Sequence, residues 1–165
     1  MCIIYYLLLS YMNPKYIEHL SAKDKKIQMR MLQKSQKNYK KGYYYSRKKL
    51  PSYKSKPSKH VLKAMKLYEI KQMPSSSAEF KDLSQKSGCS VKALQDIIRK
   101  GEGAYYSSGS RPNQTPQSWG LARLASAITG GKASKIDYHI VKTCDPKKKA
   151  FQLASKFISK RESTK

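Results

Sequence analysis

Acidic residues are scarce in this chain of 165 residues. Ten Asp and Glu stand against 35 Lys and Arg, so the formal charge at pH 7 is +25. An excess of one sign opposes compaction and favours polyanionic partners, which are nucleic acid, anionic lipid or an acidic protein surface. Because 39% of the residues are apolar, the chain is nevertheless not a fully disordered polyelectrolyte. We expect one small folded domain with basic extensions.

The carboxylates are also too scattered for enzyme chemistry. No pair of them falls within a motif for acid–base catalysis or metal binding, and no Ser or Cys lies in a nucleophile elbow. Asp137 and His139, with Lys132 and Arg123, could be drawn as a nuclease cluster, but a capping or salt-bridging role for Asp137 is the simpler interpretation. We therefore predict no enzyme activity, no catalytic residue, no metal, no cofactor and no small-molecule substrate.

Cysteine is rare as well. Cys2, Cys89 and Cys144 form neither a CxxC motif nor a Cys/His pair. An odd count at wide spacing indicates a reducing compartment and no structural zinc.

Long hydrophobic runs are absent. The longest, CIIYYLLL at residues 2–9, is less than half of the roughly 20 residues that a membrane helix needs. It also lacks the basic start and the cleavage site of a signal peptide. Residues 1–12 are therefore an apolar N-terminal extension: a buried strand, an interface plug, or an addition ahead of a true start at Met12. We expect no membrane-spanning segment.

Residues 13–57 form a basic arm rich in Lys and Tyr. Ser21 can cap a helix that reaches Lys41, with a thin apolar stripe, and Pro51 and Pro57 then favour an extended strap. Aromatic residues among cations can stack on bases, lie in a protein groove, or belong to a solvated linker. Because the arm has too few large aliphatic residues to form a core, we expect it to be ordered only against another molecule. Its candidate binding residues are Tyr39, Tyr43, Tyr44, Tyr45, Arg47, Lys48, Lys49 and Tyr53.

Residues 58–145 are predicted to be a small helical domain that begins with a short helix capped by Ser58. Gly88 suits the left-handed position that ends one helix, and Ser90 can cap the next. This is the pattern of a helix-turn-helix, with residues 91–100 in the recognition position; a plain helical hairpin is the alternative. The exposed face of that second helix would present Lys92, Gln95, Asp96 and Arg99, of which Lys92, Gln95 and Arg99 are the candidate binding residues.

Residues 101–118 are predicted to be a loop rich in Gly, Ser and Tyr. Thr115 and Pro116 then start a helix that Gly130 ends. The segment 135–142 fits a strand and a helix about equally well, and residues 146–165 form a C-terminal amphipathic basic helix. Arg111 and Arg123 could each clamp a phosphate or a carboxylate. For Arg123 a structural role is the better interpretation. The candidate binding residues of this region are Tyr105, Tyr106, Arg111, Asn113 and Arg123.

The string GEGAYYSSGSRPNQTPQSWGLARLASAITGGKASKID, residues 101–137, resembles an uncharacterised family from large double-stranded DNA viruses of algae and protists. A looser version with a G-x-RP loop, a Trp and an A-R pair occurs in tailed phages. The segment YKKGYYYSRKKLPSYKSKPSKHVLKA, residues 39–64, resembles the region that precedes this domain in the viral proteins. The resemblance implies a viral protein but no mechanism.

Two functions follow as expectations. The first is a non-enzymatic minor capsid protein on the interior face of the virion, whose arm ties neighbouring capsid subunits together. Its partners would be the major capsid protein or other virion proteins, which it would meet in the host cytoplasm during assembly. The second is a protein that binds or condenses double-stranded DNA through the helix-turn-helix and the arm.

Overall fold

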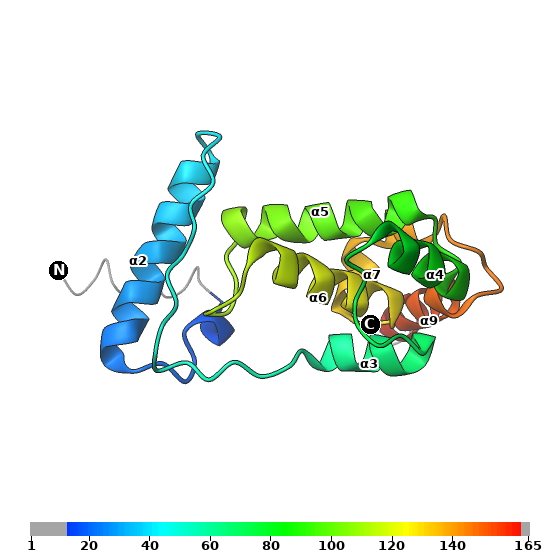
Figure 1. The fold of residues 1–165 in the computed structure, drawn as a ribbon, viewed down its shortest axis with the longest axis horizontal. Coiled ribbons are helices and arrows are strands. Elements are labelled where there is room, and N and C mark those ends of the chain that lie inside the picture. The colour runs from blue at the N-terminus through cyan, green and yellow to red at the C-terminus, as the bar shows by residue number, and fades with distance from the viewer. Residues whose placement is uncertain (1–12, 163–165) are drawn as a thin grey trace. The chain divides into compact units, whose positions relative to one another are not determined.

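The structure, a computed structural model, describes residues 13–162, without the side chains of residues 161 and 162. The apolar segment 2–9 lies outside this range. Every regular element described is helical, which confirms the expected all-α fold (Figure 1). No helix within this range combines the length and the hydropathy needed to cross a membrane. The elements are η1 (Pro14–Tyr16), α2 (Ala22–Tyr39), α3 (Lys59–Tyr68), α4 (Ser77–Ser87), α5 (Val91–Ser107), α6 (Pro116–Ile128), α7 (Lys132–Ile136), α8 (Tyr138–Val141) and α9 (Lys149–Glu162).

The chain divides into two compact units, each described here by itself. The arm unit contains residues 13–56 and 103–115, and the helical unit contains residues 57–102 and 116–162. Helix α5 begins in the helical unit and ends in the arm unit. The sequence analysis assigned residues 103–115 to the helical domain, whereas the structure groups this segment with the arm.

Helix α2 is the main element of the arm unit. The Ser21 hydroxyl accepts a hydrogen bond from the Asp24 amide at 3.2 Å, as the sequence predicts. Half of the buried face of α2 is polar, with Asp24 and Gln28 7% and 2% exposed. Its other buried residues are Met29, Met31, Leu32 and Ser35. The apolar stripe looked thin because half of this face is polar.

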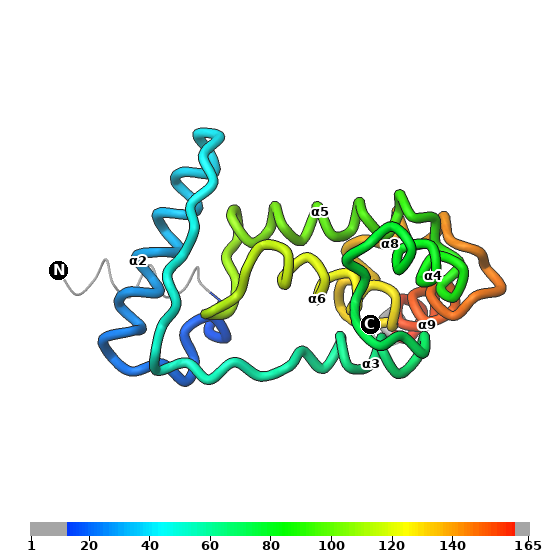
Figure 2. Tube along the Cα trace, viewed as in Figure 1, coloured from blue at the N-terminus to red at the C-terminus, as the bar shows by residue number. Residues whose placement is uncertain are grey.

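After α2 the chain returns as an extended strap alongside the helix (Figure 2). The Asp24 carboxylate accepts hydrogen bonds from the Ser52 hydroxyl at 2.6 Å and from the Ser52 amide at 3.1 Å. These two bonds lower the pKa of Asp24. The Lys48 amide lies 3.3 Å from the Met31 sulfur, and Leu50 is 3% exposed. The strap is therefore fixed to α2 at Lys48 and at Ser52.

The helical unit has one core, centred on α6. Helices α3, α7, α8 and α9 all contact α6. Leu124 and Ile128 of α6 are fully buried, together with Leu83 of α4 and Leu94 of α5. Tyr68 of α3 donates its hydroxyl proton to the Ile128 carbonyl at 2.5 Å, and burial raises the pKa of this tyrosine. The ambiguous segment 135–142 is helical, as α7 and α8.

Helix α5 corrects the expected loop at residues 101–118. It continues through Gly101 and Gly103 to Ser107, although these two glycines were predicted to lie in a turn. A Cβ atom on Gly101 would lie 2.6 Å from the Gly120 Cα atom of α6, and one on Gly120 would lie 2.8 Å from the Ile98 carbonyl oxygen. These two glycines therefore allow two helices to approach closely, and neither ends a helix.

This close approach predicts opposite effects for two neighbouring glycines of α5. Gly101→Ala should destabilise the protein by about 1–3 kcal/mol, because the new methyl group meets backbone atoms that cannot move away. Gly103→Ala is the matched control, because its Cβ would meet only the Tyr39 hydroxyl at 3.4 Å. It should be neutral, or stabilising by up to about 1 kcal/mol. Thermal melting of both variants checks this, and equal melting temperatures would contradict it.

The helix-turn-helix pair is present as expected. Gly88 ends α4 with a φ of 78°, and the Ser90 hydroxyl accepts from the Ala93 amide at 3.1 Å. At the start of α4 the Glu79 carboxylate accepts from the Ser75 amide at 2.8 Å and the Ser76 amide at 3.0 Å. These bonds, with those from side chains, lower the pKa of Glu79 to about 2.

A disulfide joins the α4–α5 turn to the segment that precedes α9, whereas the cysteine spacing was interpreted as a sign of a reducing compartment. Cys89 and Cys144 form a disulfide although 55 positions separate them in sequence. Beside it, the Asp145 amide donates to the Gly88 carbonyl at 2.8 Å. Sequence spacing could not reveal the pair, because tertiary packing alone brings these two connections together.

The disulfide predicts a dependence of stability on reductant. Reduction should lower the free energy of unfolding by about 2–4 kcal/mol, because the bond closes a long loop in the unfolded chain. Melting curves with and without a phosphine reductant measure the difference. The double variant Cys89→Ala/Cys144→Ala is the control and should melt at one temperature under both conditions. If reductant left the melting temperature of the wild-type protein unchanged, the disulfide would contribute nothing to stability.

Candidate nucleic-acid interface

The exposed face of α2 carries a stripe of cations. Positions 23, 26, 30, 34 and 37 follow one another at intervals of three or four, so they share one side of the helix. From residue 23 to residue 37 the helix rises about 21 Å. All five side chains are exposed. We call this set the α2 stripe: Lys23, Lys26, Arg30, Lys34 and Lys37.

No acidic residue compensates the α2 stripe locally. The sequence contains no Asp or Glu between Asp24 and Glu69, and Asp24 is itself buried and bonded to Ser52. The carboxylates that pair with Lys or Arg here, those of Asp82, Asp96 and Asp137, all lie in the helical unit. Like charges at this spacing each cost a helix roughly 0.2–0.5 kcal/mol. A polyanion bound along the stripe would remove that cost.

The exposed face of α5 is less suited to reading bases. Lys92 and Arg99 are 81% and 63% exposed, and Gln95 is exposed between them, as predicted. Asp96 lies in the middle of this face and pairs with both Lys92, at 2.8 Å, and Arg99. These pairs lower the pKa of Asp96. A carboxylate at the centre would be repelled by DNA phosphates, and it already occupies the two cations.

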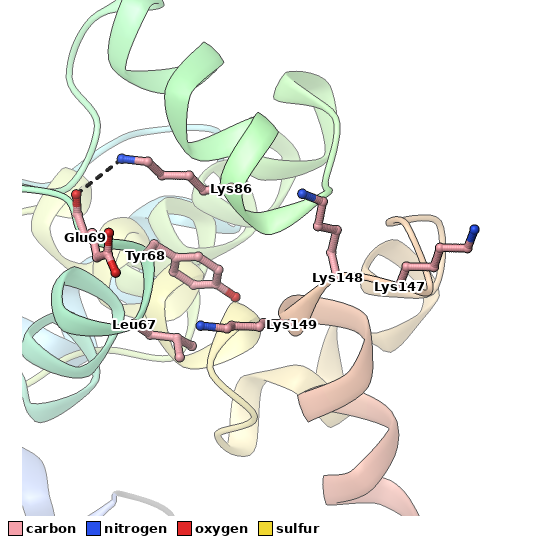
Figure 3. Close-up of a pocket in the computed structure, with 7 residues that line it drawn as sticks. All are labelled: Leu67, Tyr68, Glu69, Lys86, Lys147, Lys148 and Lys149. Atoms are coloured by element: carbon pink, nitrogen blue, oxygen red, sulfur yellow. Dashed lines mark hydrogen bonds between the residues drawn. The ribbon is translucent and has the colours of Figure 1, made fainter.

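A second group of cations surrounds a hollow of about 310 Å³ in the helical unit (Figure 3). Lys86 does not face it freely, because its ammonium group donates to the Glu69 carbonyl at 3.2 Å and pairs with Asp82 at 2.8 Å. Lys147 is turned away from the hollow in Figure 3. Since the Glu69 carboxylate also lies here, the hollow can hold a phosphate group only weakly. Its lining is Leu67, Tyr68, Glu69, Lys86, Lys147, Lys148 and Lys149.

The tyrosines of the arm meet residues of the same chain, which corrects the expectation that the arm lacks an internal partner. Tyr39 stacks on Tyr106 with 6.1 Å between ring centroids and 6° between planes. Tyr44 meets Tyr106 edge-on at 4.9 Å, and Tyr106 meets Tyr105 at 5.0 Å. Tyr105 is 2% exposed. Segment 103–107, predicted as loop, supplies this aromatic surface because α5 continues through it.

Arg47 is likewise used inside the arm unit. Its guanidinium lies 3.6 Å from the Tyr105 ring centroid. One amino group, Nη2, donates to the Tyr105 carbonyl at 3.1 Å and to the Ser110 hydroxyl at 3.0 Å. The other, Nη1, is buried and has no hydrogen-bond partner. Arg47 therefore ties the strap to segment 103–115 and does not face a ligand.

The remaining arm candidates divide between packing and exposure. Tyr53 packs on the small apolar cluster around Leu50, and the Tyr45 ring lies 4.8 Å from the Lys34 ammonium group. Lys48 and Lys49 are exposed.

Asn113 explains the role of the GSRPNQ loop. Its side-chain oxygen accepts from the Leu50 amide at 2.7 Å, and its amide nitrogen donates to the carbonyls of Leu50 at 3.1 Å and Tyr53 at 3.2 Å. The side chain thus satisfies strap backbone groups as a neighbouring strand would. Asn113 has a φ of 58°, a conformation that asparagine tolerates better than most residues.

The two arginine candidates differ. Arg123 of α6 forms a bidentate ion pair with Asp137, at 2.7 Å and 2.8 Å. Asp137 is fully buried, and the Lys100 ammonium group lies 3.8 Å from its carboxylate. Arg123 therefore has the structural role that was predicted, and Asp137 is the salt-bridging residue that the sequence also suggested. Arg111 is exposed in the loop.

The α2 stripe is the feature that the sequence analysis missed. Its signal was available: cations recur at helical spacing within a stretch that has no acidic residue.

The docking of the strap yields a prediction. Asn113→Gly keeps the left-handed backbone but removes three hydrogen bonds, so the strap should detach more often and trypsin should cut after Lys49 and Lys54 at least several-fold faster. Ser108→Gly, an exposed change in the same loop, is the control and should leave the cleavage rate unchanged. Cleavage is followed by mass spectrometry of the native protein. Identical rates for wild type and Asn113→Gly would show that Asn113 does not hold the strap.

The family is found by comparison with family models. Residues 13–150 match the model of a family of unknown function, DUF5824, and the chain belongs to that family. Neither curated proteins nor solved structures give a match.

Proposed function

We propose that this protein is a non-enzymatic DNA-binding component of a large double-stranded DNA virus, which neutralises and condenses the genome through its phosphates. The virus rests on the resemblance of residues 39–64 and 101–137 to viral proteins. The observation that carries DNA binding is the uncompensated α2 stripe. The arm unit has fifteen Lys and Arg against two acidic residues in its described part. A protein surface with this excess of cations releases counterions when it binds DNA, and it binds without regard to the base sequence.

The geometry favours phosphate contact over base reading. The stripe is straight and exposed, and its cations belong to one rigid helix. The helix-turn-helix face, in contrast, has Asp96 at its centre and two of its cations paired. DNA binding is therefore proposed for the α2 stripe, with the lysines of the hollow as weaker contacts.

A minor capsid protein that ties neighbouring subunits is the second candidate. The observation that favours it is the exposure of Tyr43 and Tyr44, 67% and 72%, which leaves aromatic surface for another virion protein. Its basis is narrower than the sequence implied, because most tyrosines of the arm pack on segment 103–115. Association with the interior face of the shell, after assembly in the host cytoplasm, is part of this proposal.

Removing charge from the stripe tests the first candidate. The variant Lys23→Gln/Lys26→Gln/Arg30→Gln/Lys37→Gln should weaken duplex binding. The slope of log affinity against log salt concentration should fall by about 2–4, since each phosphate contact contributes about 0.9. Lys34 stays unchanged because its ammonium group packs on Tyr45.

The matched control removes the same charge elsewhere. Lys66→Gln/Lys71→Gln/Lys81→Gln/Lys135→Gln changes four exposed lysines of the helical unit and should alter the salt slope by less than half as much. Equal effects of the two sets would mean that overall charge alone drives binding. Fractionation of virions separates the two candidates: a DNA-binding protein stays with the genome, whereas a capsid tie stays with the shell.

A further inference from the structure

The turn after α2 exposes aromatic surface that the arm unit does not use. Tyr43 and Tyr44 are 67% and 72% exposed, against 2% for Tyr105 in the same unit. Tyr43 makes no ring contact with another described aromatic residue, so its face is open. Exposure of two adjacent aromatic rings costs hydration free energy and calls for a ligand with flat apolar faces.

These rings are also held in place. The Tyr43 amide donates to the Asn38 carbonyl at 3.0 Å, which fixes the backbone of the turn. Tyr44 lies 6.1 Å from Tyr39 and 4.9 Å from Tyr106, ring centroid to centroid. Through Tyr106 this cluster reaches buried Tyr105. The backbone at Tyr43 and the ring of Tyr44 are therefore held in place before a ligand binds, which lowers the conformational entropy that binding costs.

Cations adjoin the platform. Lys40 and Lys41 precede it and are exposed, and Lys37 is the last residue of the α2 stripe. The nearest acidic residues in sequence are Asp24 and Glu69. Aromatic rings with exposed lysines close by in sequence match a nucleotide, which offers a base to stack and a phosphate to neutralise.

We propose that Tyr43 and Tyr44 form a base-stacking platform for unpaired nucleotides, in single-stranded DNA or RNA, at the end of the α2 stripe. This inference rests on the proposed function, since the stripe supplies the phosphate contacts. A duplex keeps its bases stacked on one another, so the platform adds affinity only where bases are unpaired. An apolar groove of a protein partner is the competing occupant, and the experiment below decides between them.

The test compares oligonucleotides of equal charge with and without bases. A twelve-nucleotide thymidine strand and an abasic strand of the same length carry the same phosphates. The full-length protein should bind the thymidine strand about tenfold more tightly at the same salt concentration. Tyr43→Ala should reduce that ratio to below about threefold by weakening only the thymidine complex. Tyr43→Trp should keep the ratio or increase it, because a larger ring stacks better.

Controls keep the outcomes distinct. Ile136→Ala removes an equally exposed apolar side chain, 63% exposed, from the helical unit and should leave the ratio unchanged. Equal affinity of the wild type for both strands would overturn the platform, while duplex binding that depends on the α2 stripe would leave the proposed function standing. Loss of binding to purified viral shells by Tyr43→Ala, with the thymidine ratio unaltered, would also overturn it and assign the tyrosines to a protein partner.

Discussion

The contact between Gly101 of α5 and Gly120 of α6 is the constraint on which the rest of the structure depends. Because neither residue has a Cβ, the two backbones meet where any side chain would separate them. Helix α5 can therefore pass α6 and continue to Ser107. This continuation holds Tyr105 and Tyr106 on a helix. The connection to α6 then carries Asn113 into contact with the strap.

The arm unit is ordered by polar contacts as much as by apolar ones. Gln28 donates to the Ser110 carbonyl at 3.3 Å, and Ser35 donates to the Tyr106 carbonyl at 3.1 Å. Together with Asn113 they satisfy backbone groups that two loop segments would otherwise leave buried and unpaired. An arm with few large aliphatic residues can fold in this way because aromatic rings and amides take the place of an aliphatic core. Its lysines are then left on the outside, where they are free to meet a polyanion.

Sequence reasoning succeeded where the signal was local. The cap at Ser21, the left-handed turn at Gly88 and the start of α6 at Pro116 each depend on a few neighbouring residues. Its predictions were wrong where the structure of a segment depends on a contact with residues far away in the sequence. The sequence suggested that Gly101 and Gly103 lie in a turn, because glycine is common in turns. Residue 101 must be glycine because it packs against Gly120, which is nineteen positions away. The Cys89–Cys144 bond and the packing of the arm on segment 103–115 were not predicted, for the same reason.

In the proposed function, charge and aromatic surface have different roles. The α2 stripe can hold any phosphate backbone, and its strength must fall with salt because counterion release drives it. Ring stacking is short-range and far less sensitive to salt, and it distinguishes an unpaired base from a paired one. The two features belong to one unit and are close in sequence, since Lys37 and Tyr43 are six positions apart. A protein built this way would remain on duplex regions by charge and pause where strands open. Neither step requires the helix-turn-helix face, whose central Asp96 is already paired with its own cations.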